Sequence, residues 1–112
     1  MESFTTIDVE TAEQKLTSGY AVLIDIRDER SYKAASVKGS YRLTDATLNE
    51  FLQAYEFDTP IMVLCYHGIS SRGAAQFLVN QGFEEVYSVN GGIEAWYHRY
   101  PEQIETGGAS AS

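Results

Sequence analysis

Cys65, the only cysteine of the chain, is the residue best placed to do chemistry. It lies between the apolar run Ile61–Leu64, which is predicted to be a buried strand, and a polar turn that contains Gly68. Residues 72–79 follow with apolar side chains at helical spacing. Cys65 is therefore predicted between a strand's carboxyl end and a helix's amino end, where unpaired N–H groups and the helix dipole favour the reactive thiolate. The alternative interpretation is a buried cysteine that acts as a small apolar side chain.

A second group of polar residues, Asp25 and Arg27, ends a mostly apolar segment that begins at Ala21. The nearly continuous apolar character of this segment predicts a strand that is covered on both faces, as parallel strands are. Ligands of parallel sheets bind outside the carboxyl ends of the strands, so we expect Asp25, Arg27 and Cys65 to share one edge of the sheet. We predict that Asp25 and Arg27 pair there and support the cysteine loop, with direct substrate contact as the alternative.

Strands and helices alternate along the chain, which predicts an α/β sandwich with a mainly parallel sheet. One helix has Asp8 as its N-cap and ends at Gly19, and another, capped by Asp45, places apolar side chains from Leu48 to Tyr55 on one face. The predicted strands are residues 4–7, 21–26, 40–43, 61–64 and 85–89, and the predicted helices after the cysteine are residues 72–81 and 93–100.

The composition limits the size and the partners of the protein. A chain of 112 residues that is 44% hydrophobic fits one domain, predicted at 1–105, followed by a flexible tail at 106–112. The net charge of −8 disfavours binding to nucleic acid or to an anionic membrane. The amino terminus lacks a basic, apolar leader and no eighteen apolar residues run together, so we expect a soluble cytoplasmic protein. With one cysteine and two histidines, we expect no metal site and no cofactor.

Three segments together resemble the rhodanese family of sulfurtransferases in order and spacing: residues 22–28, 65–71 and 90–96. A short single domain with the loop sequence Cys-Tyr-His-Gly-x-Ser-Ser is similar to the thiosulfate sulfurtransferases of that family. The resemblance implies a three-layer α/β sandwich with a five-stranded sheet. It also implies that Cys65 takes sulfane sulfur from thiosulfate as a persulfide and passes it to cyanide or to a dithiol such as thioredoxin.

The resemblance further implies that the backbone of the loop cradles the persulfide. The residues expected to bind substrate are Tyr66, His67, Gly68, Ile69, Ser70, Ser71 and Arg72. Gly68 permits a positive φ and close approach of backbone to ligand, although an ordinary turn glycine would have the same geometry.

The side chains of this loop leave several roles open. His67 either donates to substrate or shuttles a proton, or it is a plain exposed residue. Ser70 and Ser71 either cap the helix alone or cap it and also bind the sulfur anion. Arg72, in the first turn of the helix, either attracts an anion or is simply solvated.

Two departures from the family pattern concern substrate recognition. Many members carry Gly-His where this chain has Ala35-Ser36, and an arginine where it has Ser70, so the loop backbone and hydroxyls must do more of the anion binding.

One rival function is a cysteine phosphatase or arsenate reductase, which needs an arginine at the position of Ser71 to clamp the oxyanion. The other is a non-enzymatic rhodanese-like module that binds a partner protein.

Overall fold

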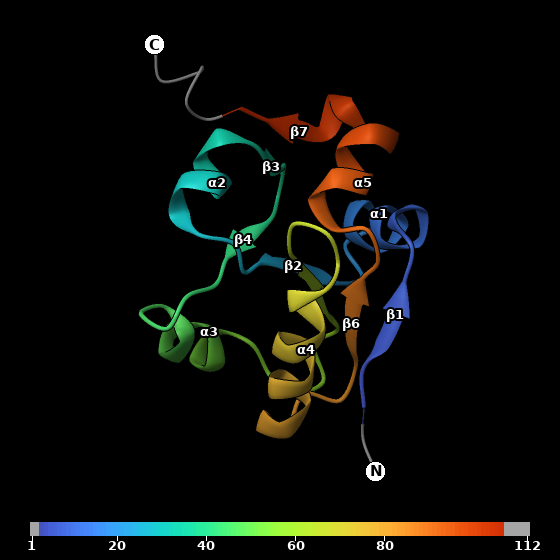
Figure 1. Ribbon diagram of the computed structural model, residues 1–112. Coiled ribbons are helices and arrows are strands. Elements are labelled where there is room, and N and C mark those ends of the chain that lie inside the picture. The colour runs from blue at the N-terminus through green and yellow to red at the C-terminus, as the bar shows by residue number, and fades with distance from the viewer. Residues whose placement is uncertain (1–2, 107–112) are drawn as a thin grey trace.

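The computed structural model describes residues 3–106 (Figure 1), so the predicted tail lies, except for Thr106, outside the described residues. The elements follow one another as β1 (Thr5–Ile7), α1 (Val9–Thr17), β2 (Val22–Asp25), α2 (Glu29–Ala34), β3 (Ser36–Val37), β4 (Tyr41–Arg42), α3 (Leu48–Ala54), β5 (Ile61–Leu64), α4 (Ser70–Gln81), β6 (Val86–Val89), α5 (Gly92–Arg99), a 3-10 turn (Pro101–Gln103) and β7 (Ile104–Glu105).

The predicted three-layer α/β sandwich with a five-stranded sheet is confirmed. The central sheet has the strand order β1-β6-β5-β2-β4, and all four of its pairings are parallel. Helices α1 and α5 cover one face of the sheet, and α3 and α4 cover the other (Figure 1). Within residues 3–106, no helix has the length and apolar character that a membrane crossing requires.

The continuous apolar sequence of β5 follows from its central place in the sheet. Met62 and Leu64 pack into the core beneath α1 and α5, whereas Ile61 and Val63 pack beneath α3 and α4. Successive side chains of a strand point to opposite faces, so a strand with helices on both faces needs apolar residues at every position. All four side chains are completely buried, and this anchors the residue that follows, Cys65.

The cysteine edge of the sheet carries elements that the sequence pattern does not reveal. Helix α2 begins after Asp28, whose carboxylate accepts a hydrogen bond from the Ser31 amide at 2.7 Å. It is six residues long and contains no buried residue, so it leaves no apolar stripe in the sequence. The short strands β3 and β7 pair antiparallel in a second sheet, which lies beside α2 and α5 (Figure 1).

The two predicted helix caps have different outcomes. Asp8 caps α1 as predicted, since its carboxylate accepts from the Thr11 amide at 2.8 Å. The prediction for Asp45 is wrong: α3 begins after Thr47, and Asp45 is exposed. Thr44 and Thr47 instead form reciprocal hydrogen bonds, each hydroxyl accepting from the other residue's amide, and this turn replaces the expected cap.

Candidate functional site

The Cys65 thiol lies in the turn between β5 and α4, with only 4% of the residue exposed. Two backbone amides point at its sulfur atom: the Gly68 N–H donates to Sγ at 3.1 Å and the Ser71 N–H at 3.2 Å. The Gly68 amide belongs to the loop and the Ser71 amide to the first turn of α4. Convergent N–H groups at a helix amino end form a site for a negative charge.

The surroundings of Cys65 act on its acidity in opposite directions. Burial raises the pKa of the thiol, because the charged form loses water. The Ser71 hydroxyl and amide, and the amides of Gly68 and His67, stabilise the thiolate, lower that pKa and outweigh burial. The pKa of Cys65 therefore lies below its ordinary value, which favours the nucleophilic thiolate.

A buried pair of hydroxyls supports this arrangement, and only one of its members is part of the predicted site. Ser71 Oγ lies 2.7 Å from Ser88 Oγ of β6, and both residues are completely buried. The expectation that Ser70 and Ser71 cap α4 is wrong, because Ile69 occupies the N-cap position and no side chain caps this helix. No sequence signal identifies Ser88, because a serine within a strand does not reveal its partner across the sheet.

We expect Ser71→Ala to raise the pKa of Cys65, because the variant loses the hydroxyl that stabilises the thiolate and keeps the amide. A hydrogen bond to a charged group contributes about 1.5 kcal/mol, so alkylation by iodoacetamide below the titration midpoint should slow roughly ten-fold. The measurement is the alkylation rate as a function of pH, whose midpoint should move to higher pH. Ser88→Ala is the matched control, since it breaks the same buried pair and leaves the Ser71 hydroxyl in place. An unshifted midpoint in Ser71→Ala would contradict this role of the hydroxyl.

The amino end of α5 fixes the backbone of the cysteine loop. The amides of Ile93 and Glu94 donate to the carbonyl oxygens of Cys65 and Tyr66 at 2.8 and 3.3 Å. This contact requires Gly92, whose φ is +59° and where a Cβ would lie 2.4 Å from both carbonyl oxygens. Gly91 and Gly92 are thus the signal in the sequence that a second segment completes the site.

Gly68 makes the reciprocal approach from the loop to α5. Its φ of +91° confirms the predicted positive value, and a Cβ there would lie 2.6 Å from the Gly91 nitrogen. The side chain of His67 reinforces the same junction, since Nδ1 lies 2.8 Å from Glu94 Oε1. His67 thus directs its amide toward Cys65 and its ring toward α5.

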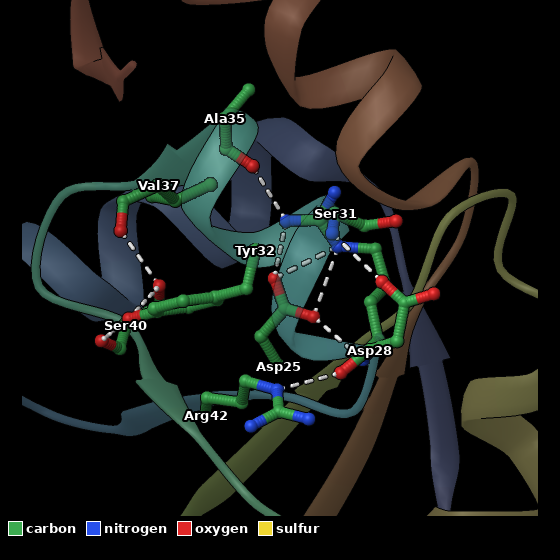
Figure 2. Close-up of polar contacts among 9 residues, drawn as sticks. Asp25, Asp28, Ser31, Tyr32, Ala35, Val37, Ser40 and Arg42 are labelled. Atoms are coloured by element: carbon green, nitrogen blue, oxygen red, sulfur yellow. Dashed lines mark hydrogen bonds and ion pairs between the residues drawn. The ribbon is translucent and has the colours of Figure 1, made fainter. Parts of the chain in front are cut away.

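Asp25 and Arg27 pair at the cysteine edge, as predicted. The completely buried Asp25 carboxylate accepts from the Arg27 guanidinium, with Nη2 and Oδ2 separated by 2.8 Å. Arg27 Nη2 also donates to the Ala35 carbonyl at 2.7 Å, and Figure 2 labels both of these partners of Arg27, Asp25 and Ala35. The pair therefore fastens the connection between α2 and β3 to the end of β2. None of the hydrogen bonds among residues 3–106 joins this pair directly to the cysteine loop.

A pocket of about 240 Å³ opens beside Cys65. Of the predicted site residues, the structure brings Arg27, Cys65, Tyr66 and Ser70 to its wall. The other lining residues are Ile26, Asp28 and Ser31. Gly68 and Ser71 contact the sulfur through their amides and do not line this pocket, and neither do the exposed Ile69 and Arg72. Nowhere in residues 3–106 do three or more His, Cys, Asp or Glu side chains gather in a group that could hold a metal ion.

Comparison with known proteins places this site in a family. A model of the rhodanese-like domain matches residues 8–99, which include β2, the cysteine loop and all of α5. The chain belongs to the rhodanese-like domain family. Its resemblance to that family, inferred from three short segments, is thereby confirmed.

Several solved structures share the fold of this chain. The reduced CoADR-RHD protein of Bacillus anthracis superposes with a TM-score of 0.75 over 90% of this chain at 26% identity, and the chain spans only 18% of that larger protein. A rhodanese-related protein of Thermoplasma volcanium has a TM-score of 0.71 and 25% identity over 87% of this chain and 94% of its own. A Rhodopseudomonas palustris protein of unknown function, named a possible tyrosine phosphatase, has a TM-score of 0.73 and 25% identity over 86% of this chain and 81% of its own.

Proposed function

We propose that this rhodanese-like protein is a sulfurtransferase that moves sulfane sulfur from thiosulfate to a thiophilic acceptor through a persulfide on Cys65. The observation that carries the proposal is the pair of amides, from Gly68 and Ser71, that donate to the Cys65 sulfur beside a small pocket. The chemistry needs a reduced thiol, and the cytoplasm keeps thiols reduced, so we propose the cytoplasm as its location.

Two half-reactions complete the proposed cycle. The Cys65 thiolate attacks the outer sulfur of thiosulfate, the S–S bond of thiosulfate breaks, and sulfite leaves with the bonding electron pair. Cyanide, or a dithiol such as thioredoxin, then attacks the outer sulfur of the persulfide. The electron pair of the broken S–S bond returns to Cys65, which regenerates the thiolate.

The backbone amides supply the stabilisation that this cycle needs. Their hydrogen bonds favour the thiolate before the attack and the persulfide anion after it, much as an oxyanion hole favours developing charge. Arg27 lines the pocket, but its charge is balanced by the buried Asp25. With Ser70 in place of an arginine, the amides rather than a side-chain cation are proposed to hold the sulfur anion.

A phosphatase is the second candidate, because one structural relative is named a possible tyrosine phosphatase. Such an enzyme needs a guanidinium that clamps a tetrahedral oxyanion above the cysteine. The residue at that position is the buried Ser71, and the next residue, Arg72, is exposed and does not line the pocket. Arg27 does line the pocket, but it is bound to Asp25. The geometry therefore supports sulfur transfer better than phosphate chemistry.

Treatment of the protein with thiosulfate should add the mass of one sulfur atom on Cys65, and subsequent addition of cyanide should remove it as thiocyanate. Intact-protein mass spectrometry measures the first step and thiocyanate formation the second. Hydrolysis of an aryl phosphate should remain at background under the same conditions. Absence of the added sulfur would favour a binding module, and aryl phosphate hydrolysis through Cys65 at a comparable rate would favour a phosphatase.

A further inference from the structure

A second and larger cavity lies next to the cysteine pocket. It measures about 490 Å³ and is bounded by residues that follow β2, by Arg42 of β4 and the residues after it, and by helices α3 and α4. Ile26, Arg27 and Asp28 line both this cavity and the cysteine pocket. A molecule held in the larger cavity therefore lies directly beside the cysteine pocket. The combined volume of the two cavities exceeds what thiosulfate or cyanide would occupy.

Arg42 provides the cavity with hydrogen-bond donors. Its Nε donates to the Arg27 carbonyl at 3.0 Å, which fixes the direction of the guanidinium. In the part of the chain that the structure describes, the two terminal nitrogens of Arg42 have no hydrogen bond or ion pair. Figure 2 accordingly draws a dashed line at Nε of Arg42 and none at its terminal nitrogens. Such a guanidinium is suited to a bidentate contact with a carboxylate.

Carboxylate and apolar groups on the same wall restrict which ligand would fit. Asp45 lines the cavity and is exposed, and its carboxylate accepts no hydrogen bond within residues 3–106. Leu43, Leu48 and Phe77 add apolar side chains to the lining of the same cavity. A simple anion would be attracted by Arg42 and repelled by Asp45 and by Asp28, which also lines the cavity, whereas a zwitterion with a short carbon chain meets charges of both signs.

We infer that this cavity, which we call the acceptor cavity, binds a small thiol that carries an α-amino carboxylate group. Arg42 contacts the carboxylate, Asp45 contacts the ammonium group, and the thiol extends past Arg27 toward Cys65. This inference rests on the proposed sulfurtransferase function and names the acceptor class. The acceptor sulfur bonds to the outer sulfur of the persulfide, the S–S bond at Cys65 breaks with its electron pair on Cys65, and the thiol proton ends on the released persulfide.

The test compares four acceptors with thiosulfate as donor: L-cysteine, 3-mercaptopropionate, cysteamine and 2-mercaptoethanol. Arg42→Gln should raise KM about ten-fold for the two thiols with a carboxylate, since a hydrogen bond to a charged group contributes this much, and leave KM for cysteamine unchanged. Asp45→Asn should raise KM about three-fold for the two thiols with an ammonium group and leave KM for 3-mercaptopropionate unchanged. Each variant is compared with the wild type on the same acceptor, so differences in thiol acidity cancel.

Arg30→Gln is the matched control, because Arg30 is an exposed arginine of α2 that lines neither cavity. S-methyl-L-cysteine should inhibit competitively against L-cysteine, and Arg42→Gln should weaken this inhibition while Arg30→Gln should not.

If wild-type transfer to cyanide fails, the proposed function fails. If it proceeds and KM for L-cysteine is the same in Arg42→Gln and Arg30→Gln, only the acceptor cavity is overturned. Arg42→Gln loses the hydrogen bond to the Arg27 carbonyl and could unfold, whereas Asp45→Asn removes no hydrogen bond of the fold. In that case KM for cysteamine in Asp45→Asn tests the acceptor cavity, and an unchanged KM would overturn it.

Discussion

Replacement of Cys65 by serine is expected to abolish sulfur transfer from thiosulfate while the fold is retained. A serine hydroxyl is not ionised at neutral pH and is a weak nucleophile without an adjacent base, so no covalent sulfur intermediate forms. The expected loss of kcat/KM is at least about a thousand-fold, as is typical when a nucleophile is removed. The measurement is thiocyanate formation together with the intact mass after thiosulfate treatment, which should show no added sulfur.

The fold of this variant should be nearly unaffected, because serine has almost the shape of cysteine and its oxygen can accept from the Gly68 and Ser71 amides. The free energy of unfolding should therefore change by no more than about 1 kcal/mol. Sulfur transfer by Cys65→Ser at a rate near that of the wild type would show that the chemistry does not pass through this residue.

The place of Cys65 could be predicted from local sequence, because strand β5 is apolar at every position and ends where polar residues begin. The neighbourhood of Asp25 follows from the same reasoning. Strand β2, which ends at Asp25, is mostly apolar and runs parallel to β5. In the structure Asp25 pairs in register with Leu64, the residue before Cys65. A parallel sheet places all its carboxyl ends at one edge, so two separate segments could be assigned to one site without a structure.

The contacts that complete the site depend on how distant elements pack, and these could not be predicted. Ser71 and Ser88 are 17 residues apart, and His67 and Glu94 are 27 apart. Local periodicity does not determine which side chains meet across such separations. The acceptor cavity is a further example, because Arg42 is half-buried at the end of a two-residue strand that has no alternating pattern of its own.

The junction between the cysteine loop and α5 gives the second large expected effect, from Gly92→Ala. A Cβ at this position would lie 2.4 Å from the carbonyl oxygens of Cys65 and Tyr66, which belong to the backbone and cannot rotate away. The positive φ of +59° adds strain of roughly 1 kcal/mol for alanine. With the cost of forcing an extra methyl group into a packed site, the free energy of unfolding should fall by about 2 to 4 kcal/mol in total.

The same substitution should impair chemistry, because relief of the contact displaces the carbonyl groups that the Ile93 and Glu94 amides hold. The loop amides would then aim less well at the Cys65 sulfur, so the pKa of Cys65 should rise and kcat/KM for thiosulfate should fall by at least about ten-fold. Gly19→Ala is the matched control, since Gly19 has a φ of +80° but no atom within 4 Å of the added Cβ. Denaturant unfolding of both variants measures the free energy of unfolding, and iodoacetamide titration measures the pKa of Cys65. Because both glycines have a positive φ, the difference between the two variants is the effect of the close contact at Gly92. Equal losses of stability in the two variants, with an unshifted Cys65 titration, would show that the approach of α5 does not control the cysteine loop.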